Sequence, residues 1–554
     1  MDYNKLAELL YPNLPHDMQY YIGIYKPRNL APGAEVMRLG PSPTGYLHIG
    51  HLYSALISRI TTTNTNGVFY LRLEDTDQKR YIKGAGDVAY NMLCYYGVKP
   101  DEGYTGDEKP QVGEYGPYIQ SQRTEIYKAF AKELVKRGRA FPCFCGKSES
   151  KQDILERREK DLEQNDTITE HDDNCRNLSY QQIEQNIKSG KPWALKLLST
   201  GDPSVTHGFN DLIKGKRTIR ENGKDVVLVK SDGIPPYALA HVVDDTLMGT
   251  TIVVRGEEWY PSVAAHLEIF YSLGLKPPKY AHTPVISKID DGNKRKLSKR
   301  KDPEADVRYY IEQGYPKESV IEYVLNLLNS DFELWRTQNP DADISKFNFS
   351  IKKIGSNNPM FDIDKLNNIS KNVISKYTPQ DIYSQVCAWA KNYDSEFYAN
   401  LASNKDKWTT LFSIDRVNTP RPRKDIYAWS MVKAQYPYIY DANFRCSTLP
   451  PEHLQTANSA KFLQEYAKVY NHSNDKDAWY AQVQETAKKF GFVAGKDYKA
   501  NPTAYAGTIA DACALIRLAL TGSNASPDLY SIMQLLGNSE CLARLTSFAD
   551  VIDK

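Results

Sequence analysis

The chain has 554 residues, 25% of them charged, and a formal net charge of +2. This length predicts roughly three to five domains, and the near-neutral charge points to no polyanion partner, although a local basic groove is compatible with it. Because no apolar run approaches the roughly 18–20 residues that span a bilayer and the N-terminus lacks a secretory signal pattern, we expect a cytoplasmic protein with no membrane partner.

The first third of the chain begins with an N-terminal extension, residues 1–35, in which residues 5–10 predict a short helix. The next elements expected are a strand at 35–39, a helix from about residue 49, a strand at 68–73 and a helix around 88–96. Alternation of strand and helix is typical of a parallel α/β sheet. Residues 117–234 are different, because they hold three cysteines, a mixed-charge segment at 151–173 that predicts a helix, and short strands at 193–198 and 225–230.

The α/β pattern resumes at residue 235. Its expected elements are a helix at 237–243, a strand at 250–254, a helix at 262–273 and a strand at 283–287. Beyond residue 301 the periodicity is almost entirely helical, with helices expected at 307–313, 317–328, 380–392, 460–470, 479–490, 505–520 and 527–536. The fold class expected is therefore α/β, with a Rossmann-like parallel sheet, an α+β insertion at 117–234 and an all-α C-terminal half.

Residues 41–51, PSPTGYLHIGH, join the first predicted strand to its helix. Gly45 and Gly50 allow a ligand to approach the backbone closely. His48 and His51 lie around the helix start, whose free N–H groups and dipole favour anions. Two imidazoles there can donate hydrogen bonds to phosphate oxygens during attack on an α-phosphate. Isolated histidines would more plainly cap or pack the helix, but this eleven-residue context favours a phosphate site.

A cation-rich loop follows the last predicted strand. Residues 290–293, DDGN, predict a turn, and residues 296–300, KLSKR, place a serine between lysines. Such a loop can close over a triphosphate and neutralise the departing pyrophosphate. A charge run alone would indicate only an exposed basic loop. Together the two motifs predict an ATP site that transfers a nucleotide to a carboxylate.

These motifs resemble the signatures of class I aminoacyl-tRNA synthetases, and specifically of bacterial-type glutamyl-tRNA synthetases. Residues 48–51 match the HIGH signature, and residues 296–300 match the KMSKS signature with leucine for methionine. Further segments typical of the family are 71–77 (LRLEDTD), 231–237 (SDGIPPY), 240–245 (AHVVDD) and 254–259 (VRGEEW). The resemblance extends from about residue 37 to residue 308 and resumes at 520–527.

The resemblance implies a glutamate–tRNA ligase that uses ATP with Mg²⁺ to make glutamyl-adenylate and passes the glutamyl group to the 3′ end of tRNA(Glu). It implies catalytic roles for His48, His51, Lys296 and Lys299, and ATP contacts at Pro41, Thr44, Gly45, His48, Gly50, His51, Lys296, Ser298 and Lys299. The domains implied are a catalytic Rossmann-like domain in two halves (36–116 and 235–287), an acceptor-stem-binding insertion (117–234), a KMSKS-loop and stem-contact region (288–370) and a helical anticodon-binding domain (371–554).

L-Glutamate carries two carboxylates and one ammonium, so its site needs cations and an anion at the carboxyl ends of the strands. The contacts that the resemblance implies are Arg38 with Tyr237 on the side-chain carboxylate, Arg255 on the α-carboxylate, Glu74 with Ser42 on the ammonium, and His241. Bidentate arginine–carboxylate pairing gives both energy and selectivity. Structural salt bridges or core packing are the alternatives for these residues. Gly40 stands where the family commonly has alanine, and we expect this departure to be mild.

Cys143, Cys145 and Cys175 resemble the cysteines of a structural zinc site that some family members carry. The usual fourth ligand position holds Asn177, and His171 is a candidate substitute. Structural zinc requires four ligands in a tetrahedron, so a zinc site and plain reduced thiols both stay open on the sequence.

Three other functions are compatible with parts of this sequence: a short paralogue that glutamylates a modified base, a catalytically silent RNA-binding protein, and a small-molecule adenylyltransferase. The chain is too long for the short paralogue, and its intact catalytic motifs argue against a silent RNA-binding protein. A small-molecule adenylyltransferase would give the long helical half no purpose. Basic clusters at 294–301, 352–353 and 421–424, the last beside Tyr427 and Trp429, are candidate tRNA contacts, although a solvated surface is the more common interpretation of any one such cluster. Charging of tRNA(Gln), the anticodon-reading residues and the role of residues 1–35 stay open, and we expect a monomer.

Overall fold

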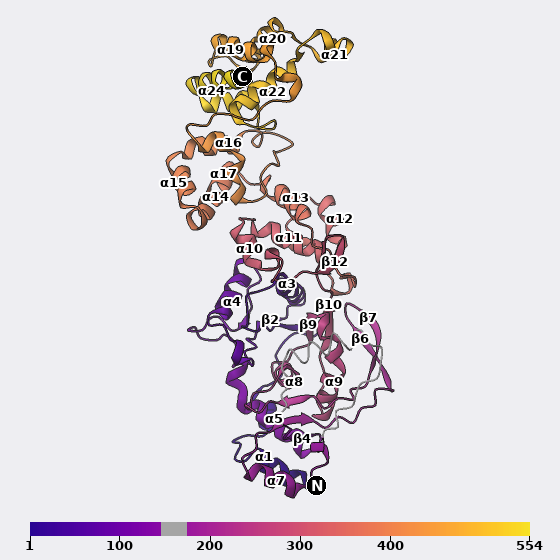
Figure 1. Ribbon diagram of the computed structural model, residues 1–554. Coiled ribbons are helices and arrows are strands. Elements are labelled where there is room, and N and C mark those ends of the chain that lie inside the picture. The colour runs from indigo at the N-terminus through magenta and orange to yellow at the C-terminus, as the bar shows by residue number, and fades with distance from the viewer. Residues whose placement is uncertain (146–173, 554) are drawn as a thin grey trace. The chain divides into compact units, whose positions relative to one another are not determined.

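The computed structural model describes residues 1–145 and 174–553. These residues form two compact units (Figure 1). The first unit comprises Met1–Tyr309 and Val324–Asp362, and the second comprises Tyr310–Tyr323 and Ile363–Lys554. Of the helices in the described residues, none combines the length and apolar character needed to cross a membrane.

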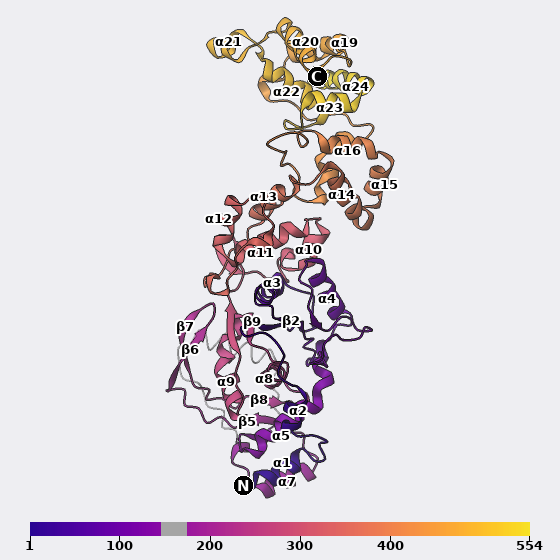
Figure 2. The same cartoon turned by 180° about the vertical axis from the view of Figure 1, so that it is seen from behind.

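A seven-stranded sheet organises the described part of the first unit (Figures 1 and 2). Its order is β3 (Glu102–Gly103), β2 (Val68–Leu71), β1 (Val36–Leu39), β9 (Ile252–Gly256), β10 (Lys279–Thr283), β6 (Thr206–Asp211) and β7 (Gly215–Arg220). All neighbouring strands are parallel except the β6–β7 hairpin, which forms one edge. All four residues of β1 are buried, as expected for a central parallel strand covered on both faces.

Helices connect and cover these strands. They are α3 (Ile49–Asn64), α4 (Ala85–Tyr95), α8 (Tyr237–Leu247) and α9 (Val263–Ser272). Helix α3 packs on β1, β2 and β9. Gly67 lets the chain turn closely from α3 into β2, because a Cβ there would lie 1.9 Å from the carbonyl oxygen of Glu35. The predicted strand–helix–strand–helix order is confirmed.

The N-terminal extension forms two helices rather than the single one expected. Helices α1 (Tyr3–Leu10) and α2 (Met18–Ile24) pack against α5 (Thr124–Lys136). The second was missed because prolines surround it, yet Asp17 caps it by accepting a hydrogen bond from the Tyr20 amide at 2.8 Å. The extension therefore adds apolar side chains to a core shared with α8 and α9.

A smaller antiparallel sheet lies between the two halves of the main sheet in the chain. It consists of β4 (Ala140–Cys143), β5 (Ala194–Leu197) and β8 (Val227–Val229), with α7 (Tyr180–Lys188) nearby in sequence. The strands expected at 193–198 and 225–230 are confirmed as β5 and β8. The mixed-charge segment at 151–173 and His171 lie outside the described residues. Strands β6 and β7, from the same region of the chain, join the large sheet instead.

The strand expected at 283–287 is wrong. Strand β10 ends at Thr283, and a hairpin of β11 (Ser287–Asp290) and β12 (Asn293–Lys296) begins four residues later. Pro284, which lacks an N–H donor, cannot continue a paired strand. The predicted turn at 290–293 is confirmed, because Asp291 and Gly292 have φ of 47° and 78°, as tight hairpins require.

Helices make up most of the remaining chain. They are α10 (Val307–Glu312), α11 (Lys317–Leu328), α12 (Ser330–Gln338), α13 (Ile363–Ile374), α14 (Pro379–Tyr393), α15 (Ser395–Ser403), α16 (Lys405–Ser413), α17 (Val432–Gln435), α18 (Pro437–Tyr440), α19 (Ala457–Val469), α20 (Lys476–Lys489), α21 (Gly495–Ala500), α22 (Ile509–Thr521), α23 (Leu529–Leu536) and α24 (Asn538–Ile552). The short strands β13 (Phe492–Val493) and β14 (Gly507–Thr508) pair in parallel.

The predicted helical C-terminal half and the predicted fold class are confirmed. The second unit holds two apolar clusters, one around Trp408 and one around Leu515. Trp429, which stands beside the basic cluster at 421–424, is only 3% exposed within the first of these, so its ring packs in the core and offers no surface for a base. The domain boundaries given above stay a prediction.

Candidate active site

The loop after β1 is fixed by its own backbone. Pro41 and Pro43 are buried, and their carbonyl oxygens accept hydrogen bonds from the amides of Glu74 and Ile82 at 3.0 and 2.8 Å. Ser42 is exposed, whereas Thr44 and Gly45 are half-buried. The loop therefore presents its polar residues at the carboxyl end of β1, directly before the N-terminus of α3.

Two histidines cap helix α3 through their Nδ1 atoms. Nδ1 of His48 accepts from the Gly50 amide at 2.9 Å, and Nδ1 of His51 accepts from the His48 amide at 3.1 Å. Because a neutral imidazole carries one proton, both rings keep that proton on Nε2. Each Nε2–H is then a donor at a helix N-terminus, where anions are favoured.

Burial keeps both rings neutral. Burial and then the nearby Lys299 lower the pKa of His48 to about 4, and the same causes in the same order lower the pKa of His51 to about 3. At neutral pH both histidines are therefore uncharged rings that carry their proton on Nε2.

The KLSKR loop lies against the first motif. Leu297 is 1% exposed and its amide donates to the Ile286 carbonyl at 2.9 Å. A hydrogen bond between the His48 ring and the Leu297 backbone partly opposes the lowering of the His48 pKa. The ammonium of Lys299 donates to the Tyr46 carbonyl oxygen. Lys296 is exposed and Ser298 is half-buried. The structure thus brings together two motifs that are more than two hundred residues apart in the chain.

Asp302 anchors this loop, and the sequence analysis missed it. Its carboxylate accepts from the Ser298 amide at 2.9 Å and from both terminal nitrogens of Arg295 at 2.6 and 2.8 Å. The hydrogen bonds from Arg295 hold the pKa of Asp302 well below its usual range. The buried Asp302 carboxylate therefore binds both Arg295 on β12 and Ser298 in the loop that follows.

A buried arginine lies near the carboxyl end of β1, just before the first motif. Arg38 is 4% exposed; its Nε lies 3.2 Å from the Asp245 carboxylate, and its Nη2 donates to the Tyr237 hydroxyl at 3.1 Å. Asp245 also accepts from Arg72 at 2.7 Å and from the His241 ring at 2.6 Å. Burial acts to raise the pKa of Asp245, but the positive charges of Arg38 and Arg72 hold it well below its usual range.

Glu74 occupies the space that Gly40 leaves free. Its carboxylate accepts from Nη2 of Arg72 at 2.9 Å, and burial raises its pKa. A Cβ on residue 40 would lie 2.2 Å from Oε1 of Glu74. An alanine there would therefore require the Glu74 carboxylate to move, and the expectation that glycine at position 40 is a mild departure stays a prediction.

Arg255, near the end of β9, contacts the same Tyr237 hydroxyl and has no carboxylate partner among the described residues. Its Nε donates to Nε2 of His282 at 3.0 Å, and its Nη1 lies 3.2 Å from Nδ1 of His266 and 3.4 Å from the Tyr237 hydroxyl. Its Nη2 is buried and has no hydrogen-bond partner among the described residues. The guanidinium is only 6% exposed, so this site holds a buried cation that lacks an anion within reach in the described chain.

His241 is packed beneath the ring of Tyr237 and is fully buried. It is 0% exposed, its two nitrogens contact Asp245 and the Tyr280 hydroxyl at 2.6 and 2.9 Å, and Tyr237 stacks on its ring with centroids 5.1 Å apart. Burial lowers its pKa to about 4. The structure therefore gathers Arg38, Tyr237 and Arg255 around one point and places His241 as their support.

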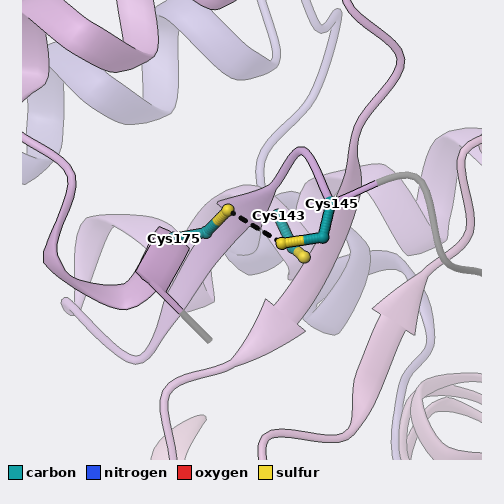
Figure 3. Close-up of side chains that lie close together, drawn as sticks. All are labelled: Cys143, Cys145 and Cys175. Carbon is teal, nitrogen blue, oxygen red and sulfur yellow. Dashed lines mark hydrogen bonds between the residues drawn. The ribbon is translucent and has the colours of Figure 1, made fainter. Parts of the chain in front are cut away.

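The three cysteines converge at the edge of the small sheet (Figure 3). Cys143 ends β4, Cys145 follows it, and Cys175 comes from the short 3₁₀ helix Asn174–Asn177. The three Sγ atoms lie within 4.8 Å of one another, and those of Cys145 and Cys175 are 3.4 Å apart. Tetrahedral Zn²⁺ with Zn–S bonds of about 2.3 Å needs sulfurs about 3.8 Å apart, so this cluster fits three corners of such a site. The described residues supply three ligands to it, and His171 lies outside them.

Comparison with known families identifies both parts of the chain. Residues 35–376 match the family model described as "tRNA synthetases class I (E and Q), catalytic domain", and residues 432–549 match the model described as "Anticodon binding domain". The first match contains both motifs and every pocket residue described above.

Full-length relatives agree with these matches. The chain is 41% identical to the protein named Glutamate--tRNA ligase in Clostridium perfringens strain SM101, over 99% of this chain and all of that protein, and 41% identical to the one in Acetivibrio thermocellus, over 98% and 99%. A crystal structure of glutamate-tRNA synthetase from Elizabethkingia anophelis shares the fold, with a TM-score of 0.69, 23% identity and coverage of 94% of this chain and all of that one. The chain therefore belongs to the glutamate–tRNA ligase family of class I aminoacyl-tRNA synthetases.

Proposed function

We propose that this chain ligates L-glutamate to tRNA(Glu). The carboxylate of glutamate attacks the α-phosphate of ATP, which releases pyrophosphate, and the ribose hydroxyl at the 3′ end of the tRNA then takes the acyl group from the adenylate. One observation carries the proposal: Arg255 is a buried guanidinium with an unpartnered Nη2 and no carboxylate in reach among the described residues. Because a buried unpaired charge is costly, this position favours an anionic ligand.

The pocket matches the charges of glutamate. Arg255 would hold the α-carboxylate, and Arg38 with the Tyr237 hydroxyl would hold the side-chain carboxylate. Glu74, with the exposed Ser42, would accept from the ammonium. His241 would act indirectly, because it is fully buried and braces Tyr237 and Asp245. The geometry supports a rigid pocket, since Tyr237 touches both arginines at 3.1 and 3.4 Å.

The ATP contacts are proposed from the α3 cap and the KLSKR loop. The Nε2–H groups of His48 and His51 would donate to phosphate oxygens, and Gly50 would let the phosphates approach the helix. Lys296, Ser298 and Lys299 would neutralise the charge that develops on the leaving pyrophosphate. Mg²⁺ bound to the triphosphate would supply further charge neutralisation. Pro41, Thr44 and Gly45 would shape the loop under the nucleotide.

The partners proposed are L-glutamate, ATP and tRNA, and the match of residues 432–549 to an anticodon-binding model supports the last. Charging is tested with labelled glutamate, ATP and Mg²⁺ on purified tRNA(Glu) and, separately, on tRNA(Gln). We expect charging of tRNA(Glu). Charging of tRNA(Gln) as well would identify a relaxed enzyme, and charging of neither would refute the proposal.

We also propose a structural zinc ion on Cys143, Cys145 and Cys175, whose fourth ligand is not assigned. Elemental analysis of the purified protein should give one zinc per chain. Cys145→Ser should lower this content, whereas Cys94→Ser, a change far from the cluster in sequence, should leave it unchanged. Zinc well below one per chain in the unaltered protein would contradict the proposal.

A further inference from the structure

Arg255 is connected by hydrogen bonds to two further buried side chains, His282 and then Asp211. Its Nε donates to Nε2 of His282 at 3.0 Å, and Nδ1 of His282 lies 2.6 Å from Oδ2 of Asp211. The three residues come from β9, β10 and β6. Asp211 and His282 are 1% and 0% exposed, so both are enclosed by protein.

The geometry fixes the protonation of His282. An arginine Nε–H can only donate, so Nε2 of His282 must accept and its single proton must lie on Nδ1, toward Asp211. Burial lowers the pKa of His282, which keeps the ring neutral. Asp211 is itself held in place, because its Oδ1 accepts from the amides of Ile213 and Lys214 at 2.9 and 2.8 Å.

This arrangement differs from that of the other arginine in the pocket. Arg38 contacts the Asp245 carboxylate directly, so much of its charge is balanced inside the protein. Arg255 instead contacts a neutral acceptor, and the balancing carboxylate of Asp211 stands one ring further away. The guanidinium is therefore oriented by a hydrogen bond while its charge stays available to a ligand.

We infer that Asp211 and His282 are positioning residues that orient Arg255 for the α-carboxylate of glutamate. Asp211 selects the tautomer of His282, and His282 fixes the plane of the Arg255 guanidinium that would bind the carboxylate. The inference rests on the proposed function, since it assigns to Arg255 the substrate carboxylate. It assigns to the β6–β7 edge hairpin a role in substrate affinity.

Two substitutions of His282 separate its two hydrogen bonds. In His282→Gln the amide reaches the position of Nε2 and can still accept from Arg255, whereas in His282→Asn the amide reaches only the position of Nδ1 and contacts Asp211. We expect His282→Asn to raise the KM for glutamate about tenfold or more, as loss of a hydrogen bond to a charged group does, and His282→Gln to raise it less. The KM for ATP should change in neither.

Asp211→Asn tests the tautomer directly. Its Oδ1 can keep the two backbone hydrogen bonds, but its amide N–H₂ would donate to Nδ1 and shift the ring proton to Nε2, so that two donors face each other at Arg255. We again expect a KM for glutamate about tenfold higher with the KM for ATP unchanged. Asn210→Ser, an exposed change on the same strand, is the matched control and should have no effect.

Nitrogen-15 NMR of histidine-labelled protein reads the tautomer without any activity. Only ten histidines are present, and His282→Gln identifies the signal. We expect an Nδ1–H signature in the unaltered protein and an Nε2–H signature in Asp211→Asn. An Nε2–H signature in the unaltered protein, or equal KM values for glutamate in His282→Asn and His282→Gln, would overturn the inference. A protein with the expected tautomer that charges no tRNA would refute the proposed function instead.

Discussion

The two ring nitrogens of His51 have different expected roles: Nδ1 stabilises the start of α3, and Nε2–H is the proposed donor in catalysis. Nδ1 of His51 accepts from the His48 amide at 3.1 Å, while Nε2 has no acceptor among the described residues. Asparagine places an oxygen near the position of Nδ1, and glutamine places an amide nitrogen near the position of Nε2. His51→Asn therefore keeps the cap and removes the donor, and His51→Gln does the reverse.

The two losses have different sizes. Removing a donor aimed at charge that develops in the transition state costs about 10²–10³ in kcat, or roughly 3–4 kcal/mol. Losing a helix-cap hydrogen bond costs roughly 1 kcal/mol of stability. We expect His51→Asn to lose about two orders of magnitude or more in kcat with an unchanged unfolding free energy, and His51→Gln to lose stability while keeping much of its activity.

Catalysis is measured by steady-state charging of tRNA(Glu). Stability is measured by chemical denaturation, with hydrogen exchange of residues 49–64 as the readout, so that the signal reports on α3. Both variants should keep the KM for glutamate, because His51 lies outside the arginine pocket. If His51→Asn charges tRNA at the rate of the unaltered protein, Nε2–H does not contact the reacting phosphate, and the reasoning from the cap is refuted.

Three further predictions follow from the pocket. Arg38→Ala should raise the KM for glutamate about 100-fold or more while leaving the KM for ATP nearly intact, because it removes the cation proposed to pair with the side-chain carboxylate of glutamate; an unchanged KM would remove Arg38 from the site. Gly40→Ala should displace Glu74 and raise the KM for glutamate several-fold, and an unchanged KM would mean that Glu74 has another equally good position. Acid should weaken the first unit between about pH 6.5 and 5, because burial lowers the pKa of His241 to about 4 and also lowers those of His266 and His282. The unfolded chain takes up these protons near pH 6.5, so each histidine contributes stability above that pH, of which up to about 1.4 kcal/mol per pH unit is lost below it. Equal protection factors at pH 7 and pH 5 across α8 and α9, each corrected for the intrinsic exchange rate at that pH, would contradict this.

Local pattern was enough to predict the elements that carry the motifs. The apolar run of β2 and the helical spacing in α3 can be read directly from sequence, and so can the turn before the KLSKR loop. Helix α24 was missed although Cys541, Leu545, Phe548 and Ile552 recur at helical spacing and are buried, so the signal for it was present.

Long-range pairing set the limit of the sequence analysis. Asp211 and His282 are 71 residues apart, and neither position has a pattern that links it to Arg255 until β6 pairs with β10. Asp302 likewise gains its role only when the β11–β12 hairpin turns Arg295 toward it. The roles of Arg38 and Tyr237 in glutamate binding came from the resemblance, whereas the residues that support them became visible only with the fold.

The site gathers several buried histidines that are all kept neutral, and the chemistry gives a reason. The proposed ligands are a triphosphate and a dicarboxylate, so cations are needed, and Arg38, Arg255 and the loop lysines provide them. Further positive charge in the same enclosed space would raise the cost of burial. Neutral imidazoles add directed donors and acceptors without added charge: His48 and His51 would donate to phosphate oxygens through Nε2–H, and His282 accepts from Arg255. Orientation thus comes from neutral rings, and attraction comes from the arginines and lysines that those rings hold or adjoin.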